Sequence, residues 1–262
     1  MADLHINWRG PLSSCNYDCG YCPFAKHVSS REELAADAEA LARFVTWCGD
    51  HDTHGRRLSI LFTPWGEGLI RKPYQRALIT LSHMPWIEAV AIQTNLSIDP
   101  ALLAEADRRS LGLWTTFHPD QVALEAFLQK CAGLDALGLR YSVGVVGLRE
   151  HFPQIEALRA RLDPKVYLWI NAYKSAGPDY YRAEERAWLE GIDPLFAHNA
   201  VRHDSLGLAC GAGEDSIFVD GRGDVRRCHF VGDVLGNLYD DGLETMLGPR
   251  PCPASRCGCF IG

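Results

Sequence analysis

Short apolar runs alternate with longer segments of helical period over roughly the first two thirds of the chain. Short apolar runs between polar turns are typical of buried strands, whereas apolar residues three and four positions apart are typical of helices. Alternating strands and helices predict right-handed βαβ units around a parallel sheet, an α/β fold. The six predicted strands are residues 4–8, 58–63, 89–94, 113–117, 140–146 and 166–171.

Start signals predict the helices between these strands. Ser30 and Glu33 form a capping box, in which each side chain accepts a hydrogen bond from the other's backbone N–H. Asp99 followed by Pro100 opens another helix, because proline favours the first helical position. The predicted helices are residues 30–48, 73–83, a segment starting at 99, 121–137 and 153–161.

Past about residue 205 this alternation stops, and a second, smaller unit is predicted. Residues 216–228 resemble a β-hairpin that turns around Gly221 and Gly223, and a short helix is predicted from about Leu243. We therefore divide the chain into a first domain, residues 1–204, and a small C-terminal module, residues 205–262.

The composition is that of a globular protein, with 47% hydrophobic and 23% charged residues. The net charge is −7 and no basic block occurs, which argues against nucleic acid as a partner because phosphate neutralisation supplies most of that affinity. The N-terminus has no basic region followed by an apolar one, and no apolar run approaches the roughly 20 residues that a membrane span requires. We expect a cytoplasmic protein with no membrane partner.

Ten cysteines in a chain without a secretion signal argue for metal ligation before disulfides. Eight of them form two groups, one near each end. Cys48 and Cys131 instead lie on apolar helical stripes, where we expect them to pack as small hydrophobic residues.

Cys15, Cys19 and Cys22 lie within eight residues of one another. Three thiolates can hold three irons of a [4Fe–4S] cluster and leave the fourth iron open, whereas a cluster held only by protein takes four. An open metal position is typical of a catalytic site. The alternatives are a partial zinc site or simple burial, although no fourth Cys or His follows at zinc-finger spacing.

The motif Cys-x-x-x-Cys-x-Tyr-Cys, with Tyr21 as its aromatic residue, resembles the signature of the radical S-adenosylmethionine superfamily. The resemblance implies a partial (β/α)6 barrel, open at one side, and S-adenosylmethionine bound to the open iron. It also implies one-electron cleavage of this cofactor to a 5′-deoxyadenosyl radical that removes a hydrogen atom from the substrate. Barrel enzymes hold their chemistry at the C-terminal ends of the strands, so we expect further site residues there.

Gly66 and Glu67 follow the second strand in a stretch similar to the family's Gly-Gly-Glu-Pro motif. In the family this motif binds the amino group of the cofactor's methionine. A carboxylate suits this role because it can accept a hydrogen bond from a cationic amine. Trp65 and Gly68 stand in place of the first Gly and the Pro of that motif. A surface turn is the alternative for such a short motif.

Two other strand ends resemble parts of the family's cofactor site. Thr94 and Asn95 are similar to a Thr-Asn-Gly stretch beside the ribose, although Asn is also a common turn residue. Val145 and Gly147 are similar to a Gly-x-Ile-x-Gly stretch beside the adenine, with Val143 in place of the first Gly.

His118 follows the fourth strand, and Tyr173 with Lys174 follows the sixth. Histidine exchanges protons near neutral pH, and a partly desolvated Lys or Tyr does so after a pKa shift. Their positions alone make these three the candidates for catalytic contact with substrate. The alternatives are a hydrogen-bonded loop histidine, a packing tyrosine and a solvated lysine.

The C-terminal module contains Cys210, Cys228, Cys252, Cys257 and Cys259. Cysteines flanking a hairpin and a short helix resemble the shortened extension, twitch or SPASM-like, that holds an auxiliary [4Fe–4S] cluster in some family members. We assign Cys210, Cys228, Cys252 and Cys257 as its ligands, with Cys259 as the spare thiol. A structural zinc site with four cysteines is the alternative.

The leading hypothesis is a radical oxidoreductase, resembling a dehydrogenase, that acts on a small polar substrate. The first strand begins within ten residues of Met1, leaving no room before it for the leader-binding domain of many peptide-modifying relatives, which slightly favours a small molecule. The alternatives are a peptide-modifying or protein-modifying enzyme and a non-catalytic iron–sulfur electron carrier. Either enzyme needs an external one-electron reductant, such as a flavodoxin-like or ferredoxin-like protein.

Overall fold

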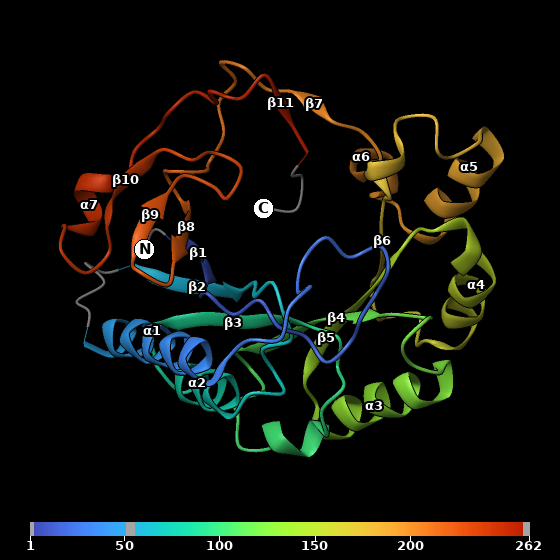
Figure 1. Ribbon diagram of the computed structural model, residues 1–262, viewed down its shortest axis with the longest axis horizontal. Helices are drawn as coiled ribbons and strands as arrows, with labels where there is room; N and C mark the ends of the chain where they lie inside the picture. The colour runs from blue at the N-terminus through green and yellow to red at the C-terminus, as the bar shows by residue number, and fades with distance from the viewer. Residues whose placement is uncertain (1–2, 51–55, 259–262) are drawn as a thin grey trace.

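A computed structural model describes residues 3–50 and 56–258. Within these residues, nine strands form one sheet in the order β10-β9-β8-β1-β2-β3-β4-β5-β6, which curves into an open ring (Figure 1). The strands are β1 Asp3–Arg9, β2 Arg57–Phe62, β3 Ile87–Thr94, β4 Leu111–Phe117, β5 Arg140–Val146, β6 Leu168–Asn171, β8 Ser216–Asp220, β9 Asp224–Arg226 and β10 Val234–Asn237. Strands β1 to β6 are parallel neighbours in chain order, as the sequence predicts.

The helices lie outside the curve of this sheet (Figure 1). They are α1 Arg31–Asp50, α2 Lys72–Ser82, α3 Leu124–Leu137, α4 Phe152–Arg161, α5 Ala183–Ile192, α6 Phe196–Asn199 and α7 Leu243–Met246. The capping box at the start of α1 is confirmed: Ser30 N donates to Glu33 Oε2 at 2.7 Å and Glu33 N donates to Ser30 Oγ at 3.1 Å.

The predicted helix does start at Asp99 and Pro100, but it is not an α-helix. The structure has a single 3₁₀ turn, Pro100–Leu103, at whose start Asp99 accepts a hydrogen bond from Ala101 N. The following residues form a separate turn, in which Asp107 accepts from Arg109 N at 2.9 Å. A short polar side chain that bonds its own backbone competes with the helix, so the link between β3 and β4 contains no α-helix.

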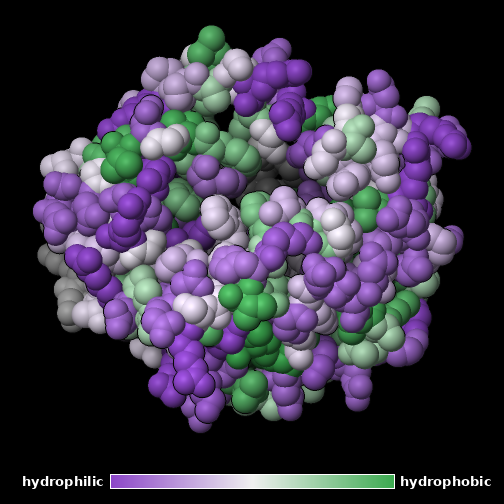
Figure 2. All heavy atoms as spheres, in the orientation of Figure 1, coloured by the Kyte–Doolittle hydropathy of each residue, from purple (hydrophilic) through white to green (hydrophobic). Residues whose placement is uncertain are grey.

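The two faces of the sheet have different roles. Alternate residues of each strand point outward and pack under the helices, with Trp8 stacked on Phe44 of α1 and edge-on to Phe62 of β2. Cys48 and Cys131 lie in this core, 0% and 3% exposed, which confirms their predicted packing. The other face lines an interior cavity of about 490 Å³ with residues such as His5 and Trp114, and Figure 2 shows the molecule hollowed near the middle of this view.

The predicted hairpin forms, and it continues the main sheet. Strand β8 pairs in parallel with β1, from His5 opposite Ser216 to Arg9 opposite Asp220, and β9 and β10 follow antiparallel. The two predicted domains therefore share one sheet. Beyond the ring, β7 His203–Asp204 pairs with β11 Arg256–Cys257 in a separate two-stranded sheet.

The free edge of β6 is covered by side chains from the segment around α6. Asp193 accepts a hydrogen bond from Ile170 N at 2.8 Å, and Asn199 donates to Ile170 O at 2.6 Å. An exposed strand edge is a site for unwanted pairing, and these two side chains occupy it. Among the helices of the described segments, none combines the length and the apolar character that crossing a membrane demands.

Candidate functional site

The first cysteine loop follows β1 and is held from two sides. Leu12 N donates to the buried carboxylate of Asp37 at 3.0 Å, which ties the start of the loop to α1. Ser14 O accepts from Glu67 N at 3.1 Å, which ties the loop to the turn after β2. Gly66 is required at this contact, because a Cβ atom there would lie 1.8 Å from Ser14 O.

Two of the three thiols of this loop are partly exposed, Cys15 and Cys22, and Cys19 is buried. Burial, and then the negative charges of Glu67 and Cys22, raise the pKa of Cys15. Burial, and then the charges of Cys22 and Cys15, raise the pKa of Cys19 to about 11. A thiolate at Cys22 would therefore oppose the ionisation of both Cys15 and Cys19. A positive metal centre between them would reverse this penalty, because thiolates bind metal deprotonated.

No three His, Cys, Asp or Glu side chains of residues 3–50 and 56–258 gather closely enough to hold a single metal ion. The thiols of the first loop are near enough to influence one another's ionisation without forming such a site.

Glu67 is 3% exposed and joins the turn after β2 to the end of β3. Its Oε1 accepts from Leu69 N at 2.9 Å and Thr94 Oγ1 at 2.8 Å, and its Oε2 accepts from Asn95 N at 2.6 Å. Burial raises the pKa of Glu67, and these hydrogen bonds partly oppose that rise. Leu96, the residue after Asn95, adopts a left-handed φ of 55°.

Asn95 connects this group to the cysteine loop. Its side-chain amide donates to Asn16 Oδ1 at 3.0 Å and lies 3.7 Å from Cys15 Sγ. The structure thus brings Cys15, Glu67, Thr94 and Asn95 together from three separate strand ends. Asn16 was not among the predicted residues, and its place inside the cysteine motif was the signal that could have found it.

His118 lies against the same loop. Its Nδ1 is 3.3 Å from Cys19 Sγ and 2.8 Å from the hydroxyl of Tyr21, whose ring stacks on the imidazole. Burial, followed by the charge of His151, lowers the pKa of His118 to about 4. His118 is therefore neutral at pH 7, with one ring nitrogen able to donate.

His151 completes this side of the loop and was not predicted. It is 1% exposed, its ring meets Tyr21 edge-on, and its Nε2 lies 3.1 Å from Asp120 Oδ2. The sequence offered only a histidine four residues beyond Gly147, which is a weak signal.

Val145 lies within β5, whereas Gly147 directly follows the strand's last residue, Val146. Gly147 packs closely on Tyr181, whose hydroxyl donates to Gly147 O at 2.7 Å. Val145 is fully buried in register with Phe117 and Ile170, on the helix-covered face. Strand alternation places Gly144 and Val146, not Val145, on the interior face.

Tyr173 and Lys174 lie apart from the contacts around Cys19. Lys174 donates to the backbone oxygens of Asn199 at 2.9 Å and Gly258 at 3.1 Å, so it links the end of β6 to the C-terminal strand. Tyr173 packs edge-on against Tyr180.

The C-terminal cysteines are spread over several segments. Cys210 is exposed, whereas Cys228, Cys252 and Cys257 are partly buried. Burial is the largest cause of the raised pKa of Cys228, and the charge of Cys257 adds to it. Cys259 lies outside the described residues.

No family model matches the sequence, and no curated protein matches it. The chain is similar in structure to native anSMEcpe with bound AdoMet, which is S-adenosylmethionine: the TM-score is 0.56 at 13% identity, over 93% of this chain and 80% of that one. For native anSMEcpe with bound AdoMet and Kp18Cys peptide the TM-score is 0.56 at 10% identity, over 92% and 80%. For BtrN in complex with AdoMet and 2-DOIA the TM-score is 0.38 at 16% identity, over 94% of this chain and 83% of that one. A TM-score this low does not establish a shared fold. The anSMEcpe matches show a shared fold.

Proposed function

We propose that the protein is a radical S-adenosylmethionine enzyme, with a [4Fe–4S] cluster on Cys15, Cys19 and Cys22. The observation that supports this most is the meeting of the three-thiol loop with Glu67 and Asn95 at adjoining strand ends. Mutual opposition among the thiolates fits a cationic cluster. A protein of the same fold, anSMEcpe, has AdoMet bound.

When bound, the cluster and S-adenosylmethionine supply a carbon radical that removes a hydrogen atom from the substrate. Glu67 uses three of the roughly four lone-pair positions of its carboxylate, and the fourth remains for the amino group of the methionine. Tyr21 and His118 cover Cys19 and keep water from that side of the loop. Asn95 holds Asn16 and lies beside Cys15, where its amide can also meet a ribose hydroxyl.

We further propose an auxiliary [4Fe–4S] cluster on Cys210, Cys228, Cys252 and Cys257, and a net oxidation of a small polar substrate. The effect of the charge of Cys257 on the pKa of Cys228 supports grouping these two ligands. The hydrogen bond from Lys174 to Gly258 supports a C-terminal segment that reaches the strand ends. About eight irons per chain in anaerobically purified protein are expected, whereas about four irons with zinc would contradict the second cluster.

The test of the main proposal is formation of 5′-deoxyadenosine by reduced protein supplied with S-adenosylmethionine. Wild type and Cys131→Ala, a core cysteine away from the loop, are expected to form it, and Cys22→Ala is expected to form none. Wild-type protein that holds its iron but forms none would contradict the enzyme and favour an electron carrier.

Modification of a peptide is the second candidate function, because anSMEcpe also has peptide bound. Deuterium-labelled cell extract, separated by size into a small-molecule fraction and a peptide fraction, distinguishes the two candidate functions. Transfer of deuterium into 5′-deoxyadenosine from the small-molecule fraction is expected, and transfer only from the peptide fraction would favour the second candidate.

A further inference from the structure

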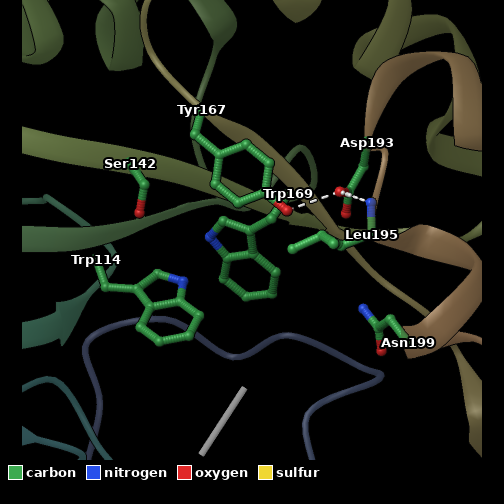
Figure 3. A pocket seen from close by; sticks show the side chains of 7 residues that line it. All are labelled: Trp114, Ser142, Tyr167, Trp169, Asp193, Leu195 and Asn199. Atoms are coloured by element: carbon green, nitrogen blue, oxygen red, sulfur yellow. Dashed lines mark hydrogen bonds between the residues drawn. The ribbon is translucent and has the colours of Figure 1, made fainter. Parts of the chain in front are cut away.

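A cavity of about 220 Å³ lies on the interior face of the sheet, beside β4, β5 and β6 (Figure 3). Trp114 of β4 and Trp169 of β6 meet edge to face there, with ring centroids 5.1 Å apart. Tyr167, which directly precedes β6, adds a third aromatic ring. Gly144 makes room for this arrangement, since a Cβ atom at that position would lie 2.1 Å from Trp169 Cε2.

A buried carboxylate faces these rings. Asp193 lines the cavity, is 1% exposed, and accepts hydrogen bonds from the Tyr167 hydroxyl at 2.7 Å, Ile170 N at 2.8 Å and Leu195 N at 2.9 Å. All three donors are neutral, and one of its roughly four lone-pair positions remains. Among residues 3–50 and 56–258, no Lys, Arg or His forms an ion pair with it.

The aromatic rings and the buried carboxylate together favour a positively charged ligand in this cavity. A buried carboxylate without a counter-charge is costly, and a cation beside it offsets that cost. Aromatic rings attract organic cations through their negative faces. Both indole N–H groups are buried without an acceptor, so a ligand oxygen near the ammonium would also satisfy donors that the described residues leave unpaired.

We propose that this pocket binds the ammonium group of an amino alcohol or a related organic amine, between the aromatic rings and Asp193. This inference rests on the proposed function, in that it assigns the pocket to the substrate. Trp169 is two residues and Trp114 three residues before the C-terminal end of its strand. At about 3.3 Å per residue, a substrate anchored here reaches the strand ends over about 7–10 Å.

The test is calorimetric titration of the purified protein, without S-adenosylmethionine or reductant, using ethanolamine, choline and 3,3-dimethylbutan-1-ol. The last compound has the shape of choline without its charge. At least one of the two ammonium compounds is expected to bind, and choline at least about tenfold more tightly than its neutral analogue. Because no radical chemistry is involved, the result is independent of 5′-deoxyadenosine formation, and either proposal can fail alone.

Variants locate the binding. Asp193→Asn and Trp169→Leu are each expected to weaken binding by about tenfold, whereas Asp163→Asn, an exposed carboxylate, is expected to leave it unchanged. Trp169→Leu keeps all the hydrogen bonds at the β6 edge, so it remains informative if Asp193→Asn fails to fold. Failure of both amines to bind, equal binding of the neutral alcohol, or full affinity in Trp169→Leu would overturn the proposal.

Discussion

Glu67 accepts a hydrogen bond from the backbone N–H of Asn95, with 2.6 Å between Oε2 and the nitrogen. Its other oxygen accepts from Leu69 and Thr94. The side chain of Asn95 in turn donates to Asn16, inside the cysteine loop. The carboxylate therefore joins three loops, and a residue proposed to bind cofactor also maintains the shape of its own site.

Glu67→Gln replaces one acceptor oxygen with a donor, so at least one of these buried donors loses its partner. We expect the free energy of unfolding to fall by about 1–3 kcal/mol, measured by urea denaturation, and S-adenosylmethionine to bind at least about tenfold more weakly. The exposed Glu39→Gln is the control and should match wild type. Wild-type affinity in Glu67→Gln would contradict a role in holding the methionine.

Gly66→Ala and Gly20→Ala form a matched pair around the cysteine loop. A Cβ atom at Gly66 would overlap Ser14 O, whereas nothing lies within 4 Å of the same atom at Gly20. Overlap with backbone forces the two loops apart, so we expect Gly66→Ala to lose about 2 kcal/mol or more of stability and most of its iron at the first loop. Gly20→Ala should retain both, and equal iron content in the two variants would show that this contact does not shape the site.

His118 is expected to tune the first cluster. Its ring nitrogen, 3.3 Å from Cys19 Sγ, can donate to the thiolate and so stabilise the more negative, reduced cluster. Loss of one such bond, worth about 1 kcal/mol, should make the reduction potential of His118→Ala more negative by about 40 mV. A redox titration followed by electron paramagnetic resonance measures this, with His83→Ala as control. An unchanged potential would leave His118 with a packing role only.

Asp37 gives the stability of the protein a dependence on pH. Burial raises the pKa of its carboxyl, with partial opposition from hydrogen bonds donated by Leu12 N and the Tyr74 hydroxyl. A raised pKa of an acid means that its contribution is fully present below the unfolded pKa of about 3.9 and is lost as pH rises through the folded pKa. Urea unfolding from pH 4 to pH 7 should therefore show wild type losing stability relative to Asp37→Asn. A difference that is constant, or that grows in favour of wild type, would rule out this effect.

Local signals explain what could be predicted of the fold. Apolar runs located all six parallel strands, and the capping pair of Ser30 and Glu33 located the start of α1. The prediction of an α-helix after Asp99 failed because side chains in this segment bond their own backbone. That outcome depends on a few local contacts. Helix α5 was missed, and the pairing of β8 with β1 joins residues about 210 positions apart, for which no local pattern exists.

The sequence alone determined the three-thiol motif, the order of the parallel strands and the core positions of Cys48 and Cys131, because each follows from short-range spacing. Only the tertiary structure decided that Asn16 meets Asn95, that His118 lies on Cys19, and that Asp193 faces Trp114 and Trp169 across a cavity. The physical reason is that such neighbours come from different strand ends. Their contact depends on how the sheet curves and on which face each strand presents, and both follow from packing of the whole chain.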